Sequence, residues 1–303
     1  MKKIETVAIV GMGALGILYA DHITRHGGRV QFVMDEKRFE KYKDASVYCN
    51  GEERRFPCLP AGQAKPVDLL IVAVKSTGLA QALDVMEGCV GEDTVIVSVM
   101  NGITSEETIG GRYGHEKLIY TVAQGMDAMR FDNRLTYTKT GWLRIGAREE
   151  FQKENLERVC EYFDRIELEY KKEEDIMLAL WGKFMVNVGV NQVCMVFNCP
   201  YLPVWQEGTR ERETMLGAMR EVVAIANAEG LPLSEEDVMA YDAVTKTMAP
   251  DATPSMGQDR IAKRYSEVET FAGTVIAYGE KHGIPTPINR WLYSQVKQIE
   301  SGY

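Results

Sequence analysis

A glycine loop near the amino terminus constrains this chain more than any other feature of its sequence. The apolar residues 6–10 run straight into a G-x-G-x-x-G motif, and an amphipathic stretch, residues 17–26, follows. In this strand–loop–helix context the first glycine allows a tight turn, the second lets the backbone approach a pyrophosphate, and the third lets the helix pack on the strand. The N–H groups at the helix start then face the phosphates, so the motif predicts a Rossmann-type dinucleotide-binding domain. The residues expected at the cofactor are Gly11, Met12, Gly13, Ala14, Leu15 and Gly16.

Length, composition and charge are those of an ordinary globular chain. Its 303 residues suffice for two domains, and 45% hydrophobic and 26% charged residues are usual for a protein with a packed core. The net charge is −9 and basic residues occur at most in pairs, which argues against a nucleic-acid partner because phosphate neutralisation needs clustered Lys and Arg. No apolar run approaches the ~20 residues of a membrane span, so we expect no membrane association.

The first residues and the cysteines indicate a cytoplasmic protein. Lys2 and Lys3 followed by apolar residues imitate a signal peptide, but Glu5 interrupts the apolar stretch and the glycine motif follows at once. The six cysteines include no C-x-x-C pair and no zinc-like spacing with histidine, so we expect reduced thiols. His22 and His26 are four residues apart, as in some metal sites, yet no third ligand is nearby in sequence, and we expect no bound metal.

The first half of the chain alternates strand and helix patterns. A continuous apolar run at residues 69–74 is typical of a parallel strand covered on both faces. Residues 47–51 predict a hairpin with an Asn-Gly turn, and residues 134–138 and 142–145 predict antiparallel strands. The other expected strands are residues 30–34, 94–99 and 118–121, and the expected helices are residues 77–90 and 105–113. This alternation predicts an α/β domain with a mostly parallel, doubly wound sheet.

After about Tyr170 the pattern becomes helical. The charged residues 171–174 suit a domain boundary, so we expect a Rossmann domain at residues 1–170 and an all-helical substrate domain at residues 171–303. Enzymes built from two such domains place their active site in the cleft between them. The expected helices are residues 175–197, 209–228, 234–248, 255–282 and 289–300.

Three polar residues in the first of these helices are candidates for catalysis. Lys183, Asn187 and Asn191 are spaced i, i+4, i+8, so each step drifts only about 40° around a helix with ~3.6 residues per turn, and all three share one stripe. Their neighbours are mainly apolar, which predicts a polar stripe on a largely buried helix. We interpret Lys183 as a proton donor and the two amides as groups that orient a substrate. The alternative is a structural polar network between helices.

Further candidates lie where ligands bind open parallel sheets, beyond the carboxyl ends of the strands. Lys75 directly follows one buried strand, and Asn101 follows another. Ser255 begins a helix as Ser-x-x-Gln, which predicts a capping box with Gln258, although an exposed helix start also suits a carboxylate ligand. Glu267 lies further along the same expected helix, where most glutamates are merely solvated.

Several short motifs follow one another in a fixed order along the chain. They are the glycine motif, Val74-Lys75, Asn101-Gly102, Trp181-x-Lys183 with Asn187 and Asn191, Ser255-Met256-x-Gln258-Asp259, Glu267, and the ending His282-Gly283-Ile284-Pro285-Thr286-Pro287-Ile288-Asn289. In this order they resemble the ketopantoate reductase (2-dehydropantoate 2-reductase) family, within the dehydrogenases that join a Rossmann domain to a helical domain. The resemblance covers nearly the whole chain.

The resemblance implies a role for each of these residues. Lys183 would be the general acid, and Asn101, also counted as catalytic, would line the nicotinamide and substrate region together with Lys75. The remaining residues would contact ligands: Asn187 and Asn191 the substrate, Ser255 its carboxylate, and Glu267 a ribose or substrate hydroxyl.

The choice of cofactor depends on the end of the second strand. NADP-dependent members of the family typically have arginine there, whereas this chain has Asp35, followed by Glu36, Lys37 and Arg38. An acidic residue about 20 positions after the glycine motif accepts hydrogen bonds from the ribose 2′-OH and repels a 2′-phosphate. Lys37 and Arg38 are within reach of such a phosphate. We therefore expect NADP as the cofactor, with NAD as the alternative because of Asp35.

The expected function is an NAD(P)-dependent oxidoreductase acting on CH-OH groups, reducing 2-dehydropantoate to pantoate for pantothenate biosynthesis. Gln192, where the family usually has proline, and Thr253-Pro254 depart from the pattern and alter the expected substrate wall. A reductase of a different 2-oxo or 3-hydroxy acid is therefore an alternative. A nicotinamide-binding sensor without turnover is another, although a sensor has no need of a proton donor such as Lys183. The sequence leaves the choice between monomer and homodimer open.

Overall fold

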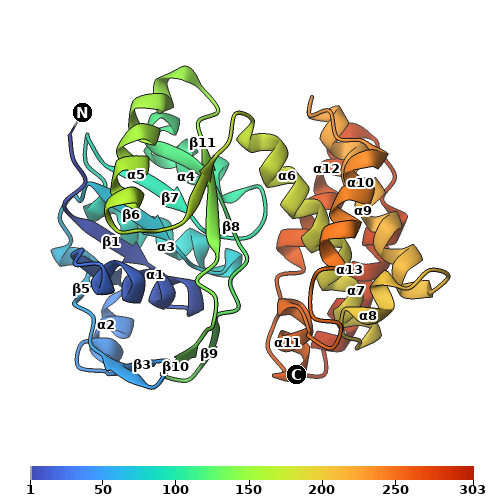
Figure 1. The fold of residues 1–303 in the computed structure, drawn as a ribbon, viewed down its shortest axis with the longest axis horizontal. Coiled ribbons are helices and arrows are strands. Elements are labelled where there is room, and N and C mark those ends of the chain that lie inside the picture. The colour runs from blue at the N-terminus through green and yellow to red at the C-terminus, as the bar shows by residue number, and fades with distance from the viewer. Residues whose placement is uncertain (1) are drawn as a thin grey trace. The chain divides into compact units, whose positions relative to one another are not determined.

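The computed structural model describes residues 2–303, which form two compact units. The first unit ends at Ile176 and the second is Met177–Tyr303 (Figure 1). The boundary expected after residue 170 falls inside strand β12 (Tyr170–Lys172), which pairs with a strand of the first unit. No helix among residues 2–303 is long and apolar enough to cross a membrane.

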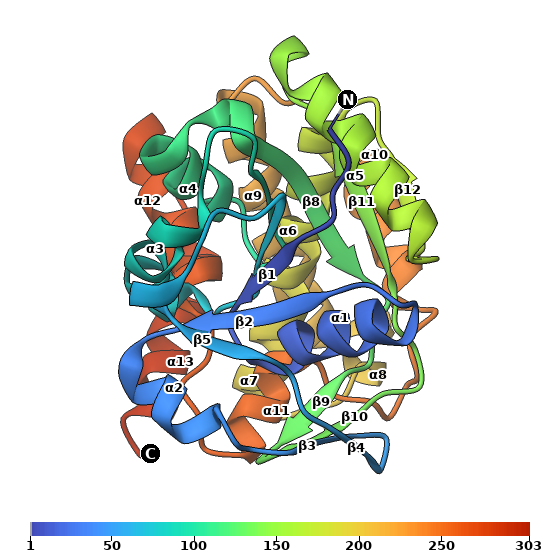
Figure 2. The ribbon, with the colours of Figure 1, turned by 90° about the vertical axis from the view of Figure 1, so that its left-hand side faces the viewer.

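The first unit is built on an eight-stranded sheet in the order β12-β11-β8-β7-β6-β1-β2-β5. Neighbouring strands pair in parallel except β8 and β11, which are antiparallel, so the predicted mostly parallel sheet is confirmed (Figure 2). The strands besides β12 are β1 (Val7–Val10), β2 (Val30–Met34), β5 (Cys58–Pro60), β6 (Leu69–Val72), β7 (Val95–Ser98), β8 (Leu118–Gln124) and β11 (Trp142–Gly146).

Helices cover both faces of this sheet. Successive side chains of a strand point to opposite faces, so each central strand contributes residues to two cores. In β1, Val7 and Ile9 join a core with α1 and α5, whereas Ala8 and Val10 join a second core with α3 and α4. The helix α5 was not among the expected elements. The helices of this unit are α1 (Ala14–Arg25), α2 (Glu36–Tyr42), α3 (Leu79–Met86), α4 (Ser105–Tyr113) and α5 (Lys153–Arg165).

A small second sheet has the order β4-β3-β10-β9. Asn50 and Gly51 both have positive φ, 49° and 86°, so the predicted hairpin with an Asn-Gly turn is confirmed. The strands expected near residues 134–138 and 142–145 are both present, but they do not pair with each other: β10 is antiparallel to β9, and β11 is antiparallel to β8. The strands of the small sheet are β3 (Val47–Cys49), β4 (Glu52–Arg54), β9 (Met129–Phe131) and β10 (Arg134–Thr136).

The ordered elements of the second unit are all helices. The expected helix at residues 175–197 is α6 (Ile176–Val186), a π-helical segment (Asn187–Asn191) and α7 (Gln192–Phe197) in succession. Gly189 allows close packing here, because a Cβ at this position would lie 2.7 Å from Met219 Cγ of α9. The other helices are α8 (Leu202–Trp205), α9 (Arg210–Ala228), α10 (Glu235–Thr245), α11 (Ser255–Ile261), α12 (Thr274–His282) and α13 (Pro287–Glu300).

The single helix expected over residues 255–282 is wrong. After α11 the chain turns at Lys263, whose φ of 49° is left-handed, and Arg264 N–H donates back to the Asp259 carbonyl at 2.9 Å. This closes the helix end as glycine usually does, although no glycine or proline marks the position. A second π-helical segment, Glu269–Gly273, then leads into α12.

Substitution of Gly16 by alanine should destabilise the first unit. A Cβ at this position would lie 1.9 Å from the Gly11 carbonyl oxygen, so the loop must shift. Overpacking of this kind typically costs about 1–3 kcal/mol, and we expect a lower thermal unfolding temperature by circular dichroism.

Gly111→Ala is the matched control for this substitution. It lies in α4, where nothing is within 4 Å of an added Cβ. Because alanine is favoured over glycine inside a helix by roughly 0.5–1 kcal/mol, this variant should unfold at or above the wild-type temperature. An unchanged unfolding temperature for Gly16→Ala would contradict the steric argument.

Candidate active site

The glycine loop of the first unit lies at the carboxyl end of β1. Gly11 has a φ of 109°, and a Cβ there would lie 2.4 Å from the Ala73 carbonyl oxygen. The clash expected at Gly16 shows that α1 can approach the loop closely only if glycine occupies this position as well. α1 begins at Ala14, and its N-cap, Gly13, offers no side-chain hydrogen bond. The N–H groups of the first turn are therefore left for a ligand, as an anion-binding helix start requires.

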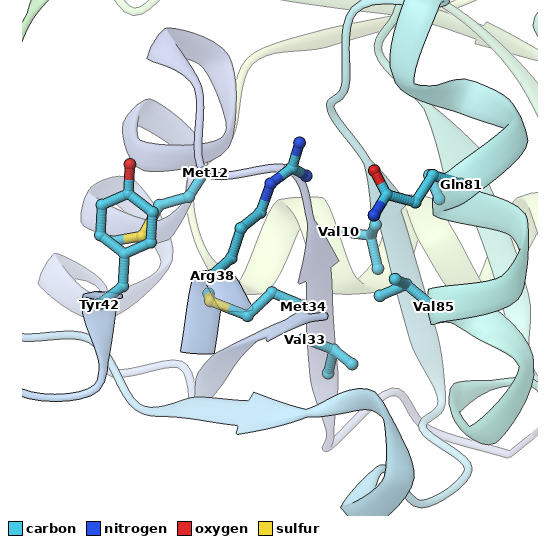
Figure 3. Close-up of a pocket in the computed structure, with 10 residues that line it drawn as sticks. Val10, Met12, Val33, Met34, Arg38, Tyr42, Gln81 and Val85 are labelled. Carbon is cyan, nitrogen blue, oxygen red and sulfur yellow. The ribbon is translucent and has the colours of Figure 1, made fainter. Parts of the chain in front are cut away.

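A pocket opens beside this loop (Figure 3). Val10, Val33 and Val85 supply apolar surface, and Arg38 and Gln81 supply polar groups. In Figure 3 the Arg38 side chain extends from α2 into the region that these residues surround. An apolar floor with a few polar groups is typical of a small-molecule or cofactor site.

The acidic and basic residues after β2 are differently placed. Asp35 is the N-cap of α2: one oxygen accepts the Arg38 backbone N–H at 2.9 Å, and the other accepts the Gln81 side-chain amide at 3.3 Å. Arg38 Nε also lies 3.5 Å from this second oxygen. Lys37 is exposed and does not line the pocket, so Arg38 is the cation that the structure brings to it.

Lys75 and Asn101 emerge from neighbouring strands of the same sheet edge. β6 and β7 pair in parallel with Val72 opposite Ser98, and each residue follows the carboxyl end of its strand. β1 is the other neighbour of β6, so the glycine loop lies at this edge too. Lys75 is exposed and Asn101 is half-buried. The first unit thus brings together the cofactor candidates predicted from strand ends.

A buried polar chain supports the loop that carries Asn101, and sequence reasoning missed it. The Ser98 and Ser105 hydroxyls are 2.9 Å apart, and Ser105 donates to a Glu106 carboxylate oxygen at 2.8 Å. Glu106 is only 1% exposed, and burial raises its pKa to about 7. In the sequence these residues look like an ordinary helix start, so no local signal reveals the hydrogen bonds among them.

In the second unit the predicted polar row is held together directly. Asn191 Nδ2 donates to Asn187 Oδ1 at 3.1 Å. Both residues belong to the π-helical segment, which has i→i+5 hydrogen bonds and more residues per turn than an α-helix, so positions four apart come closer to one line. Such segments occur frequently at functional sites.

Lys183 lies four residues before Asn187 and is half-buried. Burial lowers the pKa of its amine to about 8, while the negative charge of Glu267 acts in the opposite direction. Glu267 comes after the break that ends α11, not along a continuous helix, and directly before the second π-helical segment. The structure therefore places a carboxylate and a readily deprotonated amine in the same electrostatic environment.

Ser255 contacts the row of polar residues, but it does not form the predicted capping box. Pro254 is the N-cap of α11 and has no side-chain acceptor, and Gln258 Nε2 donates to the Thr253 carbonyl at 3.0 Å, so the predicted capping box is wrong. The Ser255 hydroxyl instead donates to Asn191 Oδ1 at 2.9 Å. Hydrogen bonds thus connect Ser255 to Asn191 and Asn191 to Asn187.

Gln192 supports this row from behind. Its side chain is fully buried: Nε2 donates to the Val188 carbonyl at 2.7 Å and to Asn289 Oδ1 at 3.2 Å, and Oε1 accepts the Ala272 N–H at 3.1 Å. Val188 and Ala272 lie in the two π-helical segments, so Gln192 ties them together. The expectation that Gln192 itself alters the substrate wall is wrong, because its side chain points into the helical core.

The two histidines of α1 contact each other and the backbone. Residues 2–303 contain no cluster of three His, Cys, Asp or Glu side chains arranged to hold a metal ion. The His22 and His26 rings stack with centroids 4.2 Å apart, and His22 Nε2 is bonded to the Ile166 carbonyl at 2.9 Å.

Comparison with known proteins divides the sequence into two corresponding parts. The family model "Ketopantoate reductase PanE/ApbA" matches residues 7–150, and "Ketopantoate reductase PanE/ApbA C terminal" matches residues 175–300. A relative from Streptococcus pyogenes serotype M3 named 2-dehydropantoate 2-reductase is 24% identical over 303 residues, which cover 97% of this chain and 98% of the relative. One of the same name from Aquifex aeolicus is 25% identical, with 96% of each chain covered.

Solved structures share the fold over nearly the full length. The 2-dehydropantoate 2-reductase from Geobacter metallireducens has a TM-score of 0.83 at 25% identity and covers 97% of this chain and 99% of its own. A complex of D-mandelate dehydrogenase with NADH has a TM-score of 0.88 at 20% identity, covering 98% and 99%. The Rossmann-type sheet followed by helices is thereby confirmed, and this chain belongs to the ketopantoate reductase family.

Proposed function

We propose that this protein is an NAD(P)H-dependent reductase of a 2-oxo acid, and that 2-dehydropantoate, reduced to pantoate in pantothenate biosynthesis, is its substrate. Membership of the family and full-length similarity to 2-dehydropantoate 2-reductases support this activity. One observation carries the catalytic assignment: the Lys183 amine, with a pKa near 8, precedes a hydrogen-bonded row of groups suited to a polar substrate.

The residues of the first unit fit a dinucleotide. At Gly11 and Gly16 an added Cβ would meet backbone, so the tight loop needs glycine at both positions, and the start of α1 would hold the pyrophosphate. Lys75 and Asn101 would line the nicotinamide region. When bound, a reduced nicotinamide supplies the hydride that the keto carbon takes up.

Lys183 supplies the proton in the proposed reaction. With a pKa of about 8 the amine is mainly protonated at neutral pH and gives up its proton more readily than an ordinary lysine. It would donate this proton to the substrate oxygen as negative charge develops there. Asn187 and Asn191 would orient the substrate, and Ser255 would bind its carboxylate.

We propose NADP as the cofactor. Arg38 lines the pocket beside the glycine loop, whereas the Asp35 carboxylate already accepts hydrogen bonds from the α2 backbone and Gln81. A guanidinium is suited to bidentate binding of a 2′-phosphate. Asp35 also supports the alternative, NAD, because its charge repels a phosphate.

A different 2-oxo or 3-hydroxy acid remains the main alternative substrate. A D-mandelate dehydrogenase shares this fold, so an aromatic 2-oxo acid belongs among the acids to be tested. Rates of reduction of 2-dehydropantoate, phenylglyoxylate and smaller 2-oxo acids, each with both cofactors, distinguish these activities. Comparable rates on unrelated acids would argue against 2-dehydropantoate. Tight cofactor binding without oxidation by any acid would instead favour a nicotinamide-binding sensor.

The proposed enzyme acts in the cytoplasm, in keeping with six free cysteines. A ketopantoate reductase from Staphylococcus aureus, with a TM-score of 0.79 at 18% identity and coverage of 98% of this chain and 99% of its own, is described as dimeric. This likeness makes a homodimer the alternative to a monomer, and sedimentation of the purified protein distinguishes them.

Lys183→Ala should lower the turnover rate by about 10²–10⁴-fold, the usual contribution of a positioned general acid. Cofactor affinity, measured by fluorescence titration, should stay almost unchanged, because Lys183 is not among the residues proposed to bind the cofactor. Retention of more than about half of the activity would exclude Lys183 as the proton donor.

Glu267→Gln should shift the pH dependence of the reaction to lower pH. The protonated Lys183 is the active form, so kcat/KM should fall as pH rises through about 8. Removing the Glu267 charge removes the effect that raises the Lys183 pKa, and the decline should begin at lower pH. Glu269→Gln is the matched control: Glu269 is exposed and pairs with Lys297, so the profile should not move. Equal profiles for both variants would contradict the coupling.

Titration of both reduced cofactors should show tighter binding of NADPH than NADH. Arg38→Ala should reduce or reverse this preference, because the proposed phosphate contact is lost. A tenfold preference corresponds to only ~1.4 kcal/mol, which one charge-assisted hydrogen bond supplies.

Lys37→Ala is the control for the cofactor measurement. Lys37 is exposed and outside the pocket lining, so its removal should change the preference much less than removal of Arg38. Clearly tighter binding of NADH to the wild-type protein would show that Asp35 determines the choice instead.

A further inference from the structure

A pair of cysteines at the end of α7 has no part in the proposed reaction. α7 ends at Phe197, its C-cap Asn198 has a left-handed φ of 53°, and the Cys199 N–H donates to the Cys194 carbonyl at 3.1 Å. This is the six-residue closure of a Schellman motif, in which the first and last side chains come into contact. Apolar residues usually make that contact, whereas here both positions carry thiols, and Cys194 lies only three residues after Asn191.

The two thiols interact with each other. The Cys194 thiol donates to the Pro200 carbonyl at 3.6 Å, and its sulfur is also within reach of a hydrogen bond with the Cys199 sulfur. This hydrogen bond lowers the pKa of Cys199 and raises that of Cys194, because it stabilises a Cys199 thiolate. Cys194 is buried at 1% exposure, whereas Cys199 is half-buried. Cys199 is therefore the more nucleophilic and the more accessible sulfur of the pair.

The four other cysteines all have raised pKa values, and all of them except Cys58 are buried. They belong to the first unit, and burial raises the pKa of Cys49, Cys58 and Cys89 to about 11 and also raises that of Cys160. Thiols with raised pKa values react slowly with oxidants, because the thiolate is the nucleophile. Cys58 is half-buried like Cys199 and so serves as a control for accessibility.

We propose that Cys194 and Cys199 form a redox modification site that closes to an intramolecular disulfide on reaction with a hydroperoxide. A disulfide requires Cα atoms within about 7 Å, a separation that the hydrogen-bonded six-residue ring allows. The site needs no residue from elsewhere in the chain.

The reaction proceeds in two balanced steps with hydrogen peroxide as the oxidant. The Cys199 thiolate attacks one peroxide oxygen, the O–O bond breaks, and hydroxide leaves, which forms a sulfenic acid on Cys199. The Cys194 sulfur then attacks the Cys199 sulfur, the S–O bond breaks, and the thiol proton leaves with hydroxide as water. Two thiols are oxidised to one disulfide, and the peroxide is reduced to two waters.

Peptide mapping of the peroxide-treated protein tests the site. Trypsin cuts after Lys183 and Arg210, and the peptide of residues 184–210 contains Cys194, Cys199 and no other cysteine. The folded, reduced protein is treated with hydrogen peroxide, alkylated with N-ethylmaleimide in denaturant and digested. We expect this peptide without maleimide and lighter by two hydrogens, with two maleimides after dithiothreitol treatment. Cys58 should remain alkylatable throughout.

Variants separate the proposed pair from general oxidation. In Cys194→Ser the sulfenic acid on Cys199 should accumulate and be trapped by dimedone, whereas Cys58→Ser should still form the disulfide. A peptide that keeps two maleimides after peroxide treatment would overturn the proposal, as would oxidation of Cys58 at the same rate. The wild-type peptide map decides the question even if Cys194→Ser does not fold.

Discussion

The side-chain hydrogen bonds of Gln192 are the interaction on which the candidate site of the helical unit depends. They join the carbonyl of Val188 in one π-helical segment to the N–H of Ala272 in the other, and they are fully buried. A buried amide that loses a partner costs about 1–3 kcal/mol, so the two segments are held at one spacing. That spacing fixes Asn191 on the first segment and Glu267 just before the second. A small residue or a proline could not make this connection.

Opposed electrostatic effects recur in both units. In the helical unit, burial lowers the pKa of Lys183 while the Glu267 charge raises it, and the outcome is an amine near neutrality. Beside the glycine loop, Asp35 and Arg38 carry opposite charges 3.5 Å apart, and each also contacts the backbone or the pocket. In each case a nearby group of opposite charge changes the electrostatic environment of the charged side chain. The sequence shows which groups are present but not how far each one is buried.

The local part of the fold was predictable from particular residues. Local sequence was enough to predict three features: the buried strand in the apolar run at residues 69–74, the glycine loop and the Asn50-Gly51 turn. The break after α11 was not predictable, because a lysine adopts the left-handed position that glycine usually takes. The partners of β10 and β11 were not predictable either, since both strands have antiparallel patterns and pairing depends on which sheet each one reaches.

The sequence by itself determined the glycine loop between β1 and α1 and the polar stripe of Lys183, Asn187 and Asn191, because each depends on spacing within one segment. The tertiary structure alone decided that Ser255 bonds to Asn191 instead of capping its own helix, that Gln192 ties two π-helical segments together, and that the Lys183 pKa falls to about 8. The two long-range hydrogen bonds join residues 64 and 80 positions apart. Burial and long-range hydrogen bonds arise only when distant segments pack, and no local pattern encodes them.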